Sequence, residues 1–63
     1  MTERQWYSGI GQHVRLERKR RGWTIYDVAA LVGRSGMWVS SIERGLIRMK
    51  AYDYYRLRQE GLL

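Results

Sequence analysis

Residues 24–45 constrain the fold more than any other stretch of this chain. Val28, Ala29 and Val32 recur at helical spacing, and Gly33 follows them directly. Because glycine adopts a positive φ without steric cost, one helix can end there and another can begin within a few residues. The stretch therefore predicts two short helices joined by a sharp turn.

Residues that commonly cap helices stand before both of these predicted helices. Thr24 precedes a helix expected over residues 25–31, and Asp27 follows three positions later as the acid of a capping box. Ser35 precedes a second helix, expected over residues 36–44. Caps, turn glycine and apolar spacing agree, so we interpret the stretch as a helix-turn-helix.

The flanking segments predict one further helix on each side. Trp6, Ile10 and Val14 share a helical stripe, which predicts a helix over about residues 6–21. A fourth helix is expected over about residues 49–60, ending before a glycine. We expect its inner face to carry Tyr52, Tyr55 and Leu57, leaving Tyr54, Arg56, Arg58, Leu62 and Leu63 free for other contacts.

Composition limits the classes of protein that the chain can represent. Its 63 residues suffice for one small domain, 1–63, and the absence of cysteine excludes disulfides and thiolate metal sites. A net charge of +6 favours a polyanionic partner, either nucleic acid or an acidic membrane surface. No apolar run approaches the ~18 residues of a spanning helix, and no signal-peptide core is present at the start, so we expect a cytoplasmic protein.

The helix-turn-helix stretch also resembles a known family. The similarity to lambda-repressor-like, Cro-type DNA-binding domains covers roughly residues 9–50 and includes the segment IGQHVRLERKRRGWT. The resemblance implies a compact all-α fold. The segments of this chain predict four helices, so we expect the fifth helix that the family often has to be absent. The resemblance is carried by Val28, Ala29, Val32, Gly33, Val39 and Ile42, followed by the tripeptide Glu43-Arg44-Gly45.

Two residues of this chain match an ion pair that is common in the family. By the resemblance, Arg18 on the first helix pairs with Glu43 at the end of the third helix. A bidentate guanidinium partner would offset the cost of burying a carboxylate and would fix the third helix on the first. An exposed pair that contributes little to stability is the alternative.

The resemblance also implies which residues face DNA, with the third helix in the major groove. The candidates for reading bases are Arg34, Ser35, Gly36, Met37 and Ser41. The candidates for contacting phosphates are Tyr26, through its backbone N–H, together with Trp38, Ser40, Arg44, Arg48 and Lys50.

The base-reading positions depart from the family pattern. Gly36 and Met37 have neither the amide nor the guanidinium that forms bidentate contacts with adenine or guanine. We expect Met37 to touch a thymine methyl, Ser41 to make one hydrogen bond, and Gly36 to let the backbone approach the duplex closely. Arg34 stands where relatives have an apolar turn residue and can reach a phosphate or a guanine. For Trp38, a place in the core and a ring facing the groove both remain open.

These features predict a small transcriptional regulator, a Cro-type repressor of a phage or mobile element that binds double-stranded DNA. A homodimer on a palindromic operator is one arrangement that we expect, with no small-molecule effector. His13 is the only histidine, and no cluster of side chains suits catalysis, a cofactor or a metal ion, so we expect neither an enzyme nor a cofactor.

Two alternatives use other partners. A protein-interaction module, such as an antitoxin or anti-host factor, would present Met37, Trp38, Leu62 and Leu63 as an exposed apolar patch. A membrane-surface role is weaker, because the basic residues are spread over several short helices instead of one amphipathic face.

Overall fold

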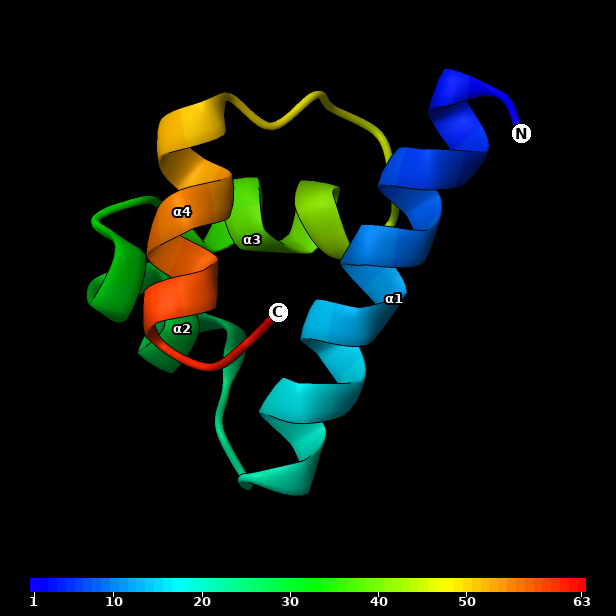
Figure 1. The fold of residues 1–63 in the computed structure, drawn as a ribbon. Coiled ribbons are helices and arrows are strands. Elements are labelled where there is room, and N and C mark those ends of the chain that lie inside the picture. Colours follow the sequence, from blue (N-terminus) through cyan, green and yellow to red (C-terminus); the bar gives the residue numbers. More distant parts are fainter.

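Four helices and no strand make up the structure, a computed structural model that describes all 63 residues (Figure 1). The helices are α1 (Glu3–Arg20), α2 (Ile25–Val32), α3 (Gly36–Glu43) and α4 (Ala51–Gln59). In Figure 1, α3 lies across the molecule between α1 on one side and α4 on the other. The predicted fold class, all-α with four helices, is confirmed.

The first helix begins one turn earlier than expected. Thr2 caps it, because the Gln5 backbone N–H donates to Thr2 Oγ1 at 3.2 Å and the Thr2 backbone N–H donates to Gln5 Oε1 at 2.8 Å. This capping box satisfies two amide groups that would otherwise lack a partner at the helix start. The expected start at Trp6 was wrong because it followed the apolar stripe and overlooked the polar cap.

The helix-turn-helix has the predicted caps. Thr24 and Asp27 form the capping box of α2, with the Asp27 carboxylate accepting from the Thr24 backbone N–H at 2.7 Å. Gly33 ends α2 in the left-handed conformation with φ of 70°. Ser35 Oγ then accepts from the Trp38 backbone N–H at 3.1 Å and starts α3. Two residues therefore separate the turn glycine from the next helix.

The inner face of α4 differs from the expected one. Asp53 and Leu57 are buried, whereas Tyr52 and Tyr55 are exposed, so only Leu57 was assigned correctly. The helix begins at Ala51, not near residue 49, and its buried stripe is a carboxylate followed by a leucine four residues later. The prediction from the spacing of the tyrosines therefore turned the wrong face of α4 toward the core.

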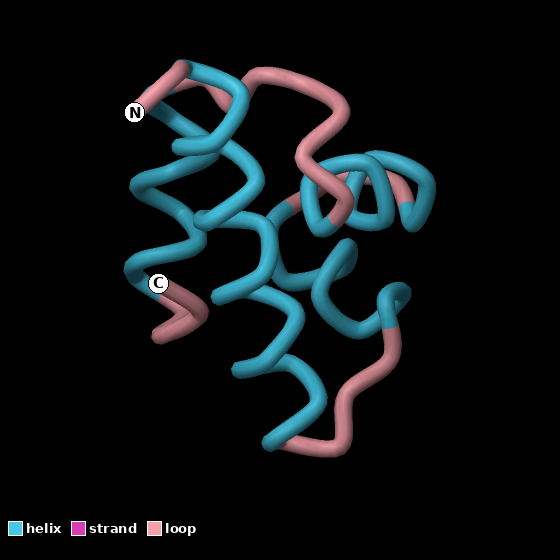
Figure 2. Tube along the Cα trace, turned by 90° about the vertical axis from the view of Figure 1, so that its right-hand side faces the viewer, coloured by secondary structure: helices cyan, strands magenta, loops and turns pink.

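The chain after α4 folds back and contributes to the core. Leu62 is completely buried, which corrects the expectation that it is free. Arg21, just after α1, holds this tail by donating to the backbone oxygens of Glu60 and Gly61, both at 2.8 Å. Figure 2 shows the tail lying beside α1. The core consists of Val14, Val28, Ala29, Val32, Val39, Ile42, Met49, Leu57 and Leu62.

A glycine allows α1 and α3 to cross closely. A Cβ atom on Gly11 would lie 2.0 Å from the backbone oxygen of Ile42 and 3.0 Å from that of Glu43. No side chain fits in that space, so the C-terminal end of α3 rests directly on the middle of α1. This contact sets the direction of α3 relative to the rest of the domain.

No helix of the fold combines the length and the apolar character that crossing a membrane requires.

Candidate nucleic-acid interface

The third helix has one face in the core and one face in solvent. Val39, Ile42 and Glu43 are buried. The opposite stripe follows the spacing i, i+3, i+4, i+7 and carries neither an acidic nor an amide side chain. Its members are Met37 and Arg44, which are exposed, and Ser40 and Ser41, which are partly buried.

The Arg18–Glu43 ion pair implied by the family resemblance is present in the structure and is buried. Arg18 Nε donates to Glu43 Oε2 at 2.7 Å, and Arg18 Nη2 donates to Oε1 at 3.0 Å. Arg18 Nη1 donates to the backbone oxygen of Trp23 at 3.0 Å. The hydrogen bonds to Glu43 raise the pKa of Arg18 above its ordinary value. One guanidinium thus connects α1, the loop before α2 and the end of α3.

A second bidentate pair, which the sequence did not lead us to expect, holds the turn of the helix-turn-helix. Arg34 Nε donates to Asp53 Oδ1 at 3.0 Å, and Arg34 Nη2 donates to Oδ2 at 2.9 Å. The same guanidinium lies over the Trp38 ring, 5.2 Å from its centroid. We therefore expect Arg34 to join the turn to α4 rather than to read a guanine or bind a phosphate. Trp38 is partly buried and packs against the core, so its ring forms the shoulder of α3.

Gly36 is covered by an aromatic ring. A Cβ atom on Gly36 would lie 2.6 Å from Cε1 and 2.8 Å from Cδ1 of Tyr26, so the ring rests against the glycine. Tyr26 itself is 76% exposed. Gly36 therefore gives the Tyr26 ring room to pack, a contact that the sequence did not indicate. The close approach of the Gly36 backbone to the duplex stays a prediction. Tyr26 also contributes a side chain to the surface, whereas the sequence suggested only its backbone N–H.

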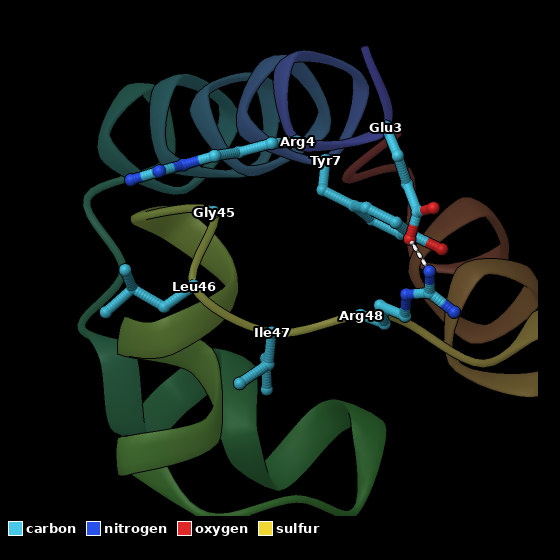
Figure 3. A pocket seen from close by; sticks show the side chains of 7 residues that line it. All are labelled: Glu3, Arg4, Tyr7, Gly45, Leu46, Ile47 and Arg48. Atoms are coloured by element: carbon cyan, nitrogen blue, oxygen red, sulfur yellow. Dashed lines mark ion pairs between the residues drawn. The ribbon is translucent and has the colours of Figure 1, made fainter.

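The loop between α3 and α4 carries the remaining cationic candidates. It passes the first turns of α1, where Arg48 pairs with Glu3 across a shallow pocket (Figure 3). Arg44 and Lys50 are exposed and make no ion pair within the chain. The pocket is lined by Glu3, Arg4, Tyr7, Gly45, Leu46, Ile47 and Arg48.

Two residues that position this surface were missed by the sequence reasoning. Asp53 is the acidic residue in the first turn of α4, and a lone carboxylate there could have been matched to the arginine in the turn. Gly11 interrupts the first helix between Ile10 and Val14, and a glycine at that place can mark a close helix crossing. Neither residue bears chemistry toward a ligand, but both determine where α3 points.

These features define a helix-turn-helix domain, which indicates DNA binding. Its first helix is capped, the chain turns sharply at a glycine, and its second helix has one face anchored in the core and one face free. The family comparison agrees, since a sequence model described as a helix-turn-helix domain matches residues 10–59. The chain belongs to this family. The match includes α4, where the resemblance expected from the sequence had weakened. No curated protein and no solved structure shows significant similarity to the chain.

Proposed function

We propose that the protein is a small Cro-type transcriptional repressor that binds double-stranded DNA sequence-specifically, with α3 in the major groove. The observation that carries this proposal is the contrast between the two faces of α3. The inner face is fixed by the core and by the Arg18–Glu43 pair, while the outer stripe from Met37 to Arg44 is unoccupied. A groove about 12 Å wide accepts such a helix.

Charge supports the same proposal. The chain carries a net charge of +6. Arg44 directly follows α3, Lys50 directly precedes α4, and neither has a carboxylate partner. We assign them to phosphate contacts, which supply affinity without sequence choice. Arg48 joins them when its exposed pair with Glu3 opens, at small cost, because exposed pairs contribute little. If two copies bind a palindrome, their half-sites lie about one helical turn, ~34 Å, apart.

The interaction-module alternative loses part of the surface on which it relied. Leu62 is in the core and Leu63 is partly buried, so the four side chains form no continuous exposed patch. Met37 remains exposed at the start of α3, where the DNA proposal also uses it. Nothing else in the structure favours a protein partner over DNA.

Electrophoretic mobility shifts across a salt series test the proposal, with random-sequence duplexes and with duplexes selected from a random library. We expect Lys50→Ala to weaken binding to both probes and to reduce the slope of log K against log salt by about 1. We expect Ser41→Ala to weaken binding to the selected duplex only, because a base contact carries sequence choice.

Lys19→Ala is the matched control for the charge. It removes the same cation from the far end of α1, away from the α3–α4 loop (Figure 1). An equal loss for Lys19→Ala and Lys50→Ala would indicate binding through net charge alone. Equal losses on both probes for Ser41→Ala would contradict a reading role for that residue, and the absence of salt-dependent binding would contradict the proposed function.

A further inference from the structure

The first turns of α2 and α3 each present one large, exposed hydrophobic side chain. Met37 is 78% exposed on the first turn of α3, and Tyr26 is 76% exposed on the first turn of α2. The Tyr26 ring rests on Gly36, the residue that precedes Met37. The Tyr26 ring and the Met37 side chain therefore both lie on the surface at the N-terminal end of α3, which enters the groove first in the proposed function. We call Tyr26 and Met37 the apolar tip.

The groups that read purines are missing from this tip. Adenine and guanine are identified in the major groove by the amide of Asn or Gln and by the guanidinium or ammonium of Arg or Lys. Positions 36, 37, 40 and 41 carry none of these groups. The nearest guanidinium on the turn, that of Arg34, is bound to Asp53 through two hydrogen bonds. The polar side-chain groups left at this end of α3 are the hydroxyls of Tyr26, Ser40 and Ser41, while the guanidinium of Arg44 lies at the opposite end of the helix.

One feature of the major groove matches an apolar tip. The C5-methyl group of thymine is the only apolar group that the base pairs display there. Cytosine has a hydrogen at C5, and its methylation at that carbon produces the same apolar group. A ring edge and a thioether exclude water from a methyl group, which is favourable, and gain nothing from a bare C5–H.

We propose that the apolar tip reads C5-methylated pyrimidines, so that the protein prefers thymine and 5-methylcytosine over uracil and unmethylated cytosine at the positions under Tyr26 and Met37. This inference rests on the proposed function and names the chemical group that it recognises. The phosphate-binding cations set the register of the helix, Ser41 makes one base contact, and the methyl groups determine the rest of the sequence choice.

Replacement of thymidine by deoxyuridine tests the proposal, because it removes the methyl group and leaves every Watson–Crick hydrogen bond intact. The probe is the duplex selected from a random library, resynthesised with deoxyuridine at single thymidine positions. Burial of one methyl group predicts about fourfold weaker binding at each position that the tip contacts, and about tenfold or more where it contacts two. At the same positions, a cytosine–guanine pair is expected to bind weakly and a 5-methylcytosine–guanine pair to recover about fourfold.

Three variants assign the effect to the tip. Met37→Ala should bind the thymidine and deoxyuridine duplexes equally at the positions that Met37 contacts, whereas Met37→Leu should keep the difference there because an apolar side chain remains. Leu16→Ala is the matched control, since Leu16 is an exposed apolar residue on α1, outside the helix-turn-helix. Both positions are exposed, so circular dichroism should show the same helix content and thermal midpoint for each variant.

The outcomes separate this inference from the proposed function. Selective, salt-dependent binding that is equal for thymidine and deoxyuridine duplexes at every position would overturn the methyl-reading role and leave DNA recognition intact. A difference that persists in Met37→Ala and in Tyr26→Ala would also overturn it. No salt-dependent binding to any duplex would overturn the proposed function, and this inference with it.

Discussion

Two bidentate arginine–carboxylate pairs hold the helix-turn-helix, and they differ in how much water reaches them. Arg18 and Glu43 have exposed side-chain fractions of 11% and 6%, whereas Arg34 and Asp53 have 37% and 3%. The first pair fixes the end of α3 on α1, and the second fixes the α2–α3 turn on α4. The orientation of the outer stripe of α3 therefore depends on one ion pair near each end of α3.

The difference in exposure predicts a difference in stability. When one partner of a buried pair is removed, the other charge stays buried without a counter-charge. The free energy of unfolding then falls by more than the intact pair contributes to it. When the partner that remains is near the surface, water replaces part of the lost interaction. We therefore expect the α1–α3 pair to be the stricter requirement and the turn pair to tolerate substitution.

The largest effect is expected for Glu43→Ala. It leaves the Arg18 guanidinium buried with only the Trp23 carbonyl as an acceptor, and should lower the free energy of unfolding by about 3 kcal/mol. Urea denaturation followed by circular dichroism measures this change. In a double-mutant cycle with Arg18→Ala, we expect a coupling energy of about 1 to 3 kcal/mol. Additive single-variant effects would show that the pair does not act as a unit.

A smaller effect is expected for Asp53→Asn. The amide keeps the shape of the carboxylate but loses its charge, while Arg34 can turn toward solvent, so we expect a loss of about 1 kcal/mol. The same denaturation experiment measures it. The matched control is Arg34→Ala, which leaves the Asp53 carboxylate buried without its partner and should destabilise more than Asp53→Asn. A loss for Asp53→Asn as large as that for Glu43→Ala would contradict the role assigned to solvent exposure.

The same two pairs show how far the sequence alone could lead. Arg18 and Glu43 are 25 residues apart, and only the family resemblance connected them. The turn pair was missed because its prediction required the rotation of α4, and the tyrosines of that helix misled the assignment of its inner face, although the lone carboxylate in its first turn was a usable signal. Tyrosine combines an apolar ring with a polar hydroxyl, so its spacing is a weaker guide to burial than that of valine or leucine.

Predictability also differed between the two faces of α3. Caps, turn glycine and aliphatic spacing identified the inner face correctly, since the local requirements of helix ends and burial all agreed there. For the outer face, the sequence provided the candidate residues but not their neighbours. The contact between Tyr26 and Gly36 joins two helices, and no periodicity within either helix reports it.

The smallest effect is expected at a third pair, which lies on the surface. Arg20 Nη2 donates to Glu17 Oε2 at 2.8 Å on the last turns of α1, and Arg20 is mostly exposed. The hydrogen bond from Arg20, aided by its charge and that of Arg21, lowers the pKa of Glu17 below its ordinary value near 4.5. A carboxyl group whose pKa is lower in the folded state stabilises the fold above its unfolded pKa, and that contribution disappears as the pH falls through the folded pKa.

We therefore expect Glu17→Gln to lower the thermal midpoint slightly at pH 7, by less than either change above, and to match the wild type once the pH falls below the folded pKa of Glu17. Thermal melts at neutral and acidic pH, each at low and high salt, measure this. Added salt should remove the difference at pH 7, because salt screens exposed charges. A salt-insensitive loss as large as that of Asp53→Asn would show that burial does not rank the three pairs, and that the geometry of the hydrogen bonds sets their strength instead.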